Sequence, residues 1–324
     1  MRRRALLAIA GAASLAWSPA AQAQTPGKLW RIGLLSNDAH SGRNARAAWG
    51  AFREELQRLG WAENRTVALE LADSDGEFDR LPAVARELLG RRVDLIVVAG
   101  GLAALAVRDA TKTTPVVFVG GADPLGQGLV ASLARPGGNL TGLANMSNEL
   151  IAKRLQLLME VAPGATRVAY LTYASGAGRF DDEAARAAAT LGLQWHVVSV
   201  ARQPDLAAAI AGHTGAEAWY VGDSILIFPR EQVPSLLATH RRPAIYPNNN
   251  FARAGGLLSY GANTFALWRR AASYVDRILR GARPADIPVE QPTYFELAVN
   301  MATARAQGIA VPQSILLRAD EVIE

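Results

Sequence analysis

Acidic, glycine and aromatic residues follow several apolar runs in this 324-residue sequence, and their chemistry suits the binding of a small molecule. Asp223 comes directly after one such run, so its carboxylate is placed to accept an ammonium group, or else to cap a helix. Gly100 and Gly101 open a predicted helix. Either the N–H groups at its start bind a carboxylate or phosphate, or the two glycines only make a tight turn between strand and helix. Asp123, which precedes a proline, is either a binding group or a turn cap.

Aromatic and amide side chains occupy the same kind of position. Tyr173, Tyr246 and Phe251 could wall an apolar part of a ligand, although such residues also belong in cores. Asn248 and residues 249–250 make a predicted loop with surplus hydrogen-bonding groups, which is equally usual in a turn. The remaining candidate binding residues follow predicted strands or lie at a predicted crossing: Ser36, Asn37, Asn145 and Ser175.

The motifs of common enzyme classes do not occur in the sequence. It contains neither G-x-x-x-x-G-K-[ST] nor G-x-S-x-G, and after Gly176-Ala177-Gly178 the third glycine of a dinucleotide fingerprint is missing. There is no cysteine, and the four histidines are scattered. We therefore expect no catalytic residue, no cofactor and no metal site. A carboxylate-dependent hydrolase stays an alternative, because acidic pairs meet only in space.

The elements that must position these residues alternate between short strands and amphipathic helices. Runs such as LIVVA and VVFV are apolar on both faces, as strands of a parallel sheet covered by helices must be. The predicted strands are Leu29–Leu35, Thr66–Leu71, Asp94–Ala99, Pro115–Val119, Arg167–Thr172, Gln194–Val200, Glu217–Val221, Pro243–Tyr246, Leu257–Tyr260 and Phe295–Val299. Helices are predicted over 48–59, 81–89, 102–110, 183–191, 206–211, 233–239, 265–280 and 302–307. Strict alternation indicates an α/β fold with doubly wound sheets.

The order of elements repeats after roughly 125–135 residues, too long a period for a solenoid. The length also exceeds what one core ordinarily supports. We therefore predict two similar doubly wound parallel-sheet lobes joined by a hinge of several crossings. The first lobe would comprise residues 28–145 and 261–290, and the second residues 146–260 and 291–324.

Residues 1–23 are predicted to be a secretory signal peptide. Arg2, Arg3 and Arg4 precede an apolar stretch, and Ala21-Gln22-Ala23 forms a cleavage site. Without these three arginines the net charge of +5 falls to +2. No clustered basic face remains, so we expect no nucleic-acid partner. General secretion is favoured over the twin-arginine route, and without cysteine no lipid anchor is expected.

The sequence resembles the ABC-transporter substrate-binding proteins of the tryptophan/tyrosine-type family, which have the type I periplasmic binding-protein fold. The resemblance is carried by DRLPAVARELLGRRVDLIVVAGGLAALAVRDATKTTPVVFVGGADPLGQGLVASLARPGGNLTG (79–142), RRPAIY with AGGLLSYG (241–261), YVDRILRGARPADIPVEQPTYFELAVN (274–300) and RADEVIE (318–324). Matching motif positions are Gly100-Gly101, Asp123-Pro124 and Gly222-Asp223. The sequence departs from the family pattern at 36–40 and 247–250, which are loops on the side expected to face a ligand.

The resemblance implies a periplasmic, non-catalytic receptor that delivers a small solute to a membrane permease. We expect an amino acid or amino-acid-like carboxylate as the solute, and a monomer. Ser36, Gly100 and Gly101 would hold the anionic group, Asp223 the ammonium, and Tyr173 or Tyr246 would lie against the side chain. Two alternatives remain: a secreted α/β hydrolase, and a sensor that presents its closed form to a membrane receptor.

Overall fold

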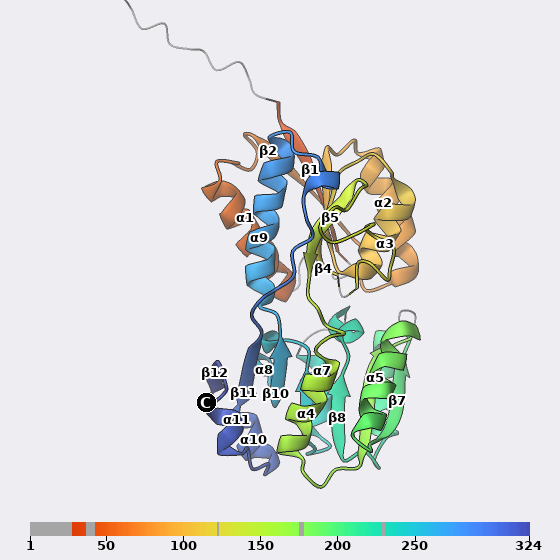
Figure 1. Cartoon of the computed structure of the whole chain (residues 1–324), viewed down its shortest axis with the longest axis vertical. Coiled ribbons are helices and arrows are strands. Elements are labelled where there is room, and N and C mark those ends of the chain that lie inside the picture. Colours follow the sequence, from red (N-terminus) through yellow and green to blue (C-terminus); the bar gives the residue numbers. More distant parts are fainter. Residues whose placement is uncertain (1–27, 37–42, 122, 175–177, 228–230) are drawn as a thin grey trace, which may run out of the picture.

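The computed structural model describes residues 28–36, 43–121, 123–174, 178–227 and 231–324. The chain forms two α/β lobes stacked along the long axis of the molecule (Figure 1). In the part of the chain that is described, no helix combines the length and apolarity needed to cross a membrane.

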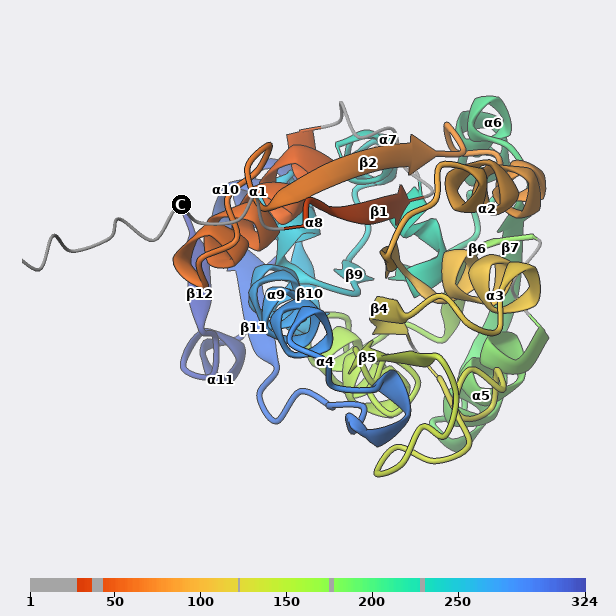
Figure 2. The same ribbon diagram turned by 90° about the horizontal axis from the view of Figure 1, so that it is seen from above.

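The first lobe is built on a five-stranded parallel sheet in the order β2-β1-β3-β4-β5. Its strands are β1 (Trp30–Ser36), β2 (Val67–Asp73), β3 (Leu95–Ala99), β4 (Val116–Gly121) and β5 (Leu140–Ala144). Its helices are α1 (Arg43–Arg58), α2 (Leu81–Gly90), α3 (Gly101–Ala110) and α9 (Thr264–Leu279), with 3-10 turns η1 (Phe78–Arg80) and η4 (Pro284–Asp286). Alternate side chains of each strand point to opposite faces, so Leu95 and Val97 pack towards α1 and α9 while Ile96 and Val98 pack towards α2 and α3. Figure 2 shows these two helix layers on either side of the sheet.

The second lobe has a seven-stranded sheet in the order β12-β11-β10-β9-β8-β6-β7. Its strands are β6 (Arg167–Tyr173), β7 (Gln194–Val200), β8 (Ala218–Val221), β9 (Ala244–Tyr246), β10 (Leu258–Gly261), β11 (Glu296–Asn300) and β12 (Glu321–Ile323). Its helices are α4 (Ile151–Val161), α5 (Gly178–Thr190), α6 (Leu206–Ala211), α7 (Gln232–Ala238), α8 (Asn249–Arg253), α10 (Met301–Gln307) and α11 (Gln313–Leu316), with 3-10 turns η2 (Gln203–Asp205) and η3 (Asp223–Ile227). Only the β10–β11 pair of this sheet is antiparallel. The two sheets therefore confirm the predicted α/β class. Two strands, β11 and β12, run in the reverse direction, which was not predicted.

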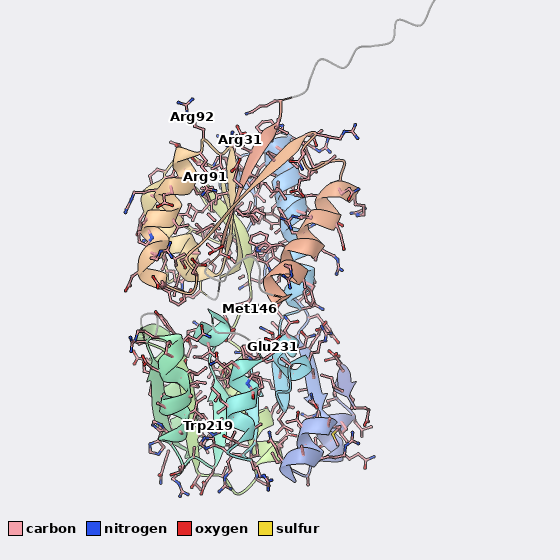
Figure 3. The ribbon with its side chains drawn as sticks, turned by 180° about the vertical axis from the view of Figure 1, so that it is seen from behind. Arg31, Arg91, Arg92, Met146, Trp219 and Glu231 are labelled. Atoms are coloured by element: carbon pink, nitrogen blue, oxygen red, sulfur yellow. The ribbon has the colours of Figure 1, made fainter. Side chains whose placement is uncertain are left out.

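The chain passes between the two sheets after β5, after β10 and before β11. Met146 lies in the first crossing, between the lobes (Figure 3), and has a left-handed backbone with φ of 53°. Residues 287–290 run beside β5 before the third crossing. There the Ala144 N–H donates to the Glu290 carbonyl at 2.9 Å, and the Thr141 hydroxyl donates to the Ile287 carbonyl at 2.7 Å. The first and third crossings thus begin side by side at the β5 edge of the first lobe.

Helix α9 follows β10 of the second lobe, yet it packs into the first lobe against α1 (Figure 1). Its Trp268 ring lies 4.2 Å, centroid to centroid, from that of Trp49 on α1, and Phe52 packs edge-on to both rings. All three side chains are buried. One face of the first lobe is therefore closed by a segment from the C-terminal part of the chain.

Some elements differ from those the sequence predicted. β5 and α4 were not predicted, and residues 249–250 begin helix α8 instead of belonging to a loop. Asn248 has an extended backbone, and its side-chain oxygen accepts the Asn250 N–H at 3.2 Å. This is the geometry of an N-cap, which satisfies a helix donor that water would otherwise solvate. The three asparagines are buried, and the loop predicted over Asn249 and Asn250 is wrong because these residues are helical.

Candidate functional site

The carboxyl ends of the parallel strands in the two lobes face one another, which is where open α/β sheets bind ligands. Two observations bring the lobes together at this place. The Phe78 ring of η1, in the first lobe, lies 4.4 Å from the Tyr173 ring at the end of β6, in the second. A cavity of about 190 Å³ is lined by residues of both lobes: Asp123, Asn148, Asp182, Glu183 and Arg186.

On the first-lobe side, Ser36 is buried at the end of β1, in register with Asp73 of β2. Gly100 has φ of 81°, a conformation that glycine adopts without strain, and its N–H donates to the Val119 carbonyl at 2.8 Å. That N–H is therefore hydrogen-bonded within the protein and is not available to a ligand, which agrees with the interpretation of Gly100 as part of a tight turn. A Cβ added at Gly101 would lie 2.8 Å from the Gln127 side-chain oxygen, so Gln127 covers the start of α3.

Asp123 and Asn145 both shape the backbone around them. One Asp123 oxygen accepts the Gly126 N–H at 2.7 Å, and the Asn145 side-chain oxygen accepts the Ser147 N–H at 3.2 Å. The Asn145 bond, two residues on, is an Asx turn, whereas the Asp123 bond, three residues on, is typical of a cap. Asp123 also borders the interlobe cavity, so its turn role does not remove it from the cleft.

Asp223 begins η3 immediately beyond β8, and its side chain is 23% exposed. Its Oδ2 accepts a hydrogen bond from Nη1 of Arg154 at 2.9 Å. In the described chain nothing donates to its other oxygen, Oδ1. Next to it, the Ser224 hydroxyl accepts the Tyr173 N–H at 2.9 Å and lies 3.0 Å from the Thr172 hydroxyl, which ties this turn to β6.

Arg154, on α4, was not among the predicted site residues. Its side chain is 1% exposed and reaches the turn after β8. Burial opposes its charge, but the Asp223 carboxylate and Tyr220 hold the pKa of the guanidinium above its ordinary value. The sequence contains a signal for it: Arg154 shares a helical face with Ile151, Leu155 and Leu158, where an apolar residue is the rule.

The aromatic residues that were predicted to line the ligand site lie in two different places. Tyr173 is 7% exposed and lies at the interlobe contact with Phe78. Tyr246 is 1% exposed and stacks on Phe251 in the core of the second lobe, with ring centroids 5.4 Å apart. Burial raises the pKa of the Tyr246 phenol. Tyr246 and Asn248 are therefore held by the core and by the cap of α8.

The arrangement thus brings together Ser36, the Gly100–Gly101 turn, Asp123, Asn145, Tyr173 and Asp223 along the facing strand ends. Asn37 and Ser175 lie outside the described residues. In the described ranges no cluster of three or more histidine, aspartate or glutamate side chains is arranged to hold a metal ion. What the site offers is a fixed carboxylate, hydroxyl and amide groups, and an aromatic ring.

Known proteins with similar sequences or folds share this architecture. A "Tyrosine-binding protein" of Clostridioides difficile is 23% identical over 277 residues, covering 83% of this chain and 80% of that protein. A conserved domain protein of Vibrio cholerae has a TM-score of 0.84, 22% identity, and covers 91% of this chain and 100% of its own. An ABC domain from Streptococcus pneumonia, solved with L-Trp, has a TM-score of 0.81, 24% identity and the same coverage of both chains.

These structures show the same type I periplasmic binding-protein fold. The family model described as "ABC transporter substrate binding protein" matches residues 39–323, which include α1, every element from there to β12, and all three crossings. The chain therefore belongs to the ABC transporter substrate-binding proteins.

Proposed function

We propose that this protein is the extracytoplasmic solute-binding protein of an ABC importer, and that it binds an amino acid or an amino-acid-like carboxylate between its lobes. The observation that carries the proposal is Asp223. Its carboxylate lies at the facing strand ends, with one oxygen bound to a buried arginine and the other without a donor in the described chain.

A carboxylate held in this way suits a ligand ammonium group. Arg154 fixes its orientation in advance, so little rotational freedom is lost when a ligand binds. The second oxygen offers a charge-assisted hydrogen bond, which is roughly twice as strong as a neutral one. A ligand that brings a positive amino group therefore satisfies Oδ1 of Asp223, which has no donor in the described chain.

The relatives support an amino acid as the solute. One is named for tyrosine and another was solved with L-Trp. An aromatic ring is present at the cleft in Tyr173, and ring pairs favour offset or edge-on packing against a second ring. We therefore infer an amino acid, with aromatic amino acids as the first ligands to test.

Capture would occur by closure of the lobes around the ligand. The chain crosses between the lobes at three places, which is the arrangement of a hinge. The Phe78–Tyr173 contact supports closure, because each ring comes from a different lobe and both are buried. In the closed form, both lobes would contribute contacts that neither makes alone.

Membership of this family implies that the protein delivers its solute to a membrane permease. We propose such a permease as the partner of this protein. The predicted signal peptide, residues 1–23, lies outside the described residues. We propose that it directs the protein to the periplasm, where the protein is monomeric and carries no lipid anchor. We also propose that the ligand leaves chemically unchanged. Incubation followed by mass spectrometry of the ligand tests this last point, and any conversion would favour the hydrolase alternative.

The test is titration calorimetry of the purified protein with the twenty amino acids and with deaminated analogues of tyrosine and tryptophan. We expect binding of an aromatic amino acid, and weaker binding of its deaminated analogue. Asp223→Asn should remove most of that difference. Asp205→Asn is the matched control, because Asp205 is an exposed aspartate of the same lobe that also pairs with an arginine. Equal affinities for amino acids and deaminated analogues would contradict the proposed ammonium site.

A further inference from the structure

Arg154 connects the turn of Asp223 to the chain crossings. Its Nη2 donates to the Ser147 hydroxyl and to the Pro247 carbonyl, both at 3.0 Å. Its Nε donates to the Tyr260 carbonyl at 2.7 Å. Ser147 lies in the first crossing, and Tyr260 is the penultimate residue of β10, just before the second. One side chain therefore contacts two crossings, the end of β9 and the turn after β8.

The guanidinium is fully used by these contacts. Arginine has five N–H donors in a planar fork. In addition to the three bonds above and the one to Asp223, Nη1 lies 3.4 Å from the Tyr220 hydroxyl. All three nitrogens thus have partners, and the plane of the fork is fixed from several directions. Asp223 is the only carboxylate that contacts it in the described chain, so its Oδ2 is held in one place.

The surroundings leave Arg154 little room to move. A Cβ added at Gly261 would lie 1.9 Å from the Pro247 carbonyl oxygen and 3.2 Å from Nη2 of Arg154. The backbone of the second crossing therefore passes directly against the acceptor that Arg154 uses. Only glycine permits this close approach, so the position of the fork is coupled to the path of the chain.

We propose that Arg154 is a positioning residue that determines the preference for ligands with an amino group. By holding Oδ2 of Asp223, it turns Oδ1 towards the interlobe cleft, where a ligand ammonium binds. This inference deepens the proposed function and rests on it. Arg154 itself does not contact the ligand; it acts through the orientation of Asp223.

Lysine at this position would keep the positive charge but lose the fork. Its three donors are on a single nitrogen, so it cannot hold Asp223, Ser147 and Tyr260 in their present directions. Arg154→Lys should therefore weaken the binding of L-tyrosine or L-tryptophan by about 10- to 100-fold, the range expected for losing one well-oriented hydrogen bond to a charged group. The deaminated analogues, 3-(4-hydroxyphenyl)propionate and indole-3-propionate, should lose no more than about twofold, because they make no bond of this kind.

The experiment is calorimetry with these four probes on the wild type, Arg154→Lys, Asp223→Asn and the double variant, with urea unfolding of each protein. In the Asp223→Asn background, Arg154→Lys should have almost no further effect on the affinity for the amino acid. Arg202→Lys is the matched control, since Arg202 makes two bonds to Asp205 on the exposed surface of the same lobe. It should leave all four affinities unchanged.

The outcomes separate this inference from the proposed function. If the wild type binds no probe, the proposed amino-acid function fails and the role of Arg154 fails with it. If the wild type binds an amino acid but Arg154→Lys leaves its affinity unchanged, only the role of Arg154 is overturned. The role is also overturned if Arg154→Lys weakens amino acid and deaminated analogue equally, because a general loss of structure would do that.

Discussion

Replacing Phe78 by alanine should open the cleft and weaken ligand binding. Phe78 belongs to the first lobe and Tyr173 to the second, yet their ring centroids lie 4.4 Å apart with an interplanar angle of 49°. Phe78 is 9% exposed and Tyr173 is 7% exposed. Separation of the lobes would expose both rings to water, so their contact favours the arrangement in which the lobes are together.

The size of the effect follows from this geometry. An aromatic pair contributes about 0.5–1.5 kcal/mol beyond the area it buries. A ligand held by both lobes binds only the closed arrangement, so its apparent affinity falls with the fraction of closed protein. Where the closed form is no longer dominant, losing the pair should lower the affinity by about twofold to twelvefold.

Calorimetry with L-tyrosine and L-tryptophan measures this change, and small-angle X-ray scattering of the ligand-free protein measures the opening as a larger radius of gyration. Tyr173→Phe keeps the ring and should therefore change both quantities less than Tyr173→Ala does. Tyr173→Ala removes the same contact from the other lobe, so it should act like Phe78→Ala, and the double variant should add little. Wild-type affinity and radius of gyration in both alanine variants would refute the reasoning.

Three further variants test other parts of the structure. Arg154→Met leaves a partly buried carboxylate without its partner and should lower the free energy of unfolding by about 3–5 kcal/mol in urea titrations; a loss below about 1 kcal/mol would show that the pair contributes little. Gly261→Ala places a Cβ 1.9 Å from a backbone carbonyl oxygen and should cost about 1–3 kcal/mol, whereas Gly164→Ala, with open space around it, should be almost neutral by the same assay. The Arg270 hydrogen bond holds the pKa of Glu290 below its ordinary value of 4.5, so its stabilisation is present above that pH and lost as the pH falls below it. Glu290→Gln should therefore show a smaller drop in thermal midpoint between pH 6 and pH 3 than the wild type, and an identical drop would contradict the assignment.

Much of the fold could be predicted from the sequence because its central strands are apolar on both faces. β3 and β4 lie within two residues of their predicted ends, since short runs of this kind are typical of strands that are buried on both faces. β5 could not be predicted in this way. Its five residues include Thr141 and Gly142, and it is a strand because it pairs with β4. Helix α4 was missed because Arg154 interrupts its apolar face.

The candidate site was predictable only in part, for a related reason. Asp223 could be placed at a strand end because it directly follows the apolar run of β8. Its partner Arg154 is 69 residues away in the sequence, and only the fold brings them together. Tyr246 is the last residue of its strand, β9, but whether its ring turns to the cleft or to the core depends on packing against Phe251. The binding roles of these residues stay predictions.

The position of α9 has a consequence for the order in which the chain can fold. Trp49 and Phe52 lie near the N-terminus, and Trp268, which completes their cluster, comes from beyond the whole central part of the second lobe. While the ribosome is still making residues before 264, this face of the first sheet can be covered by α1 but not yet by α9. Nascent domains ordinarily fold as they emerge. In this protein the first lobe must wait for a late helix, so its packing is completed only after the central part of the second lobe has been synthesised.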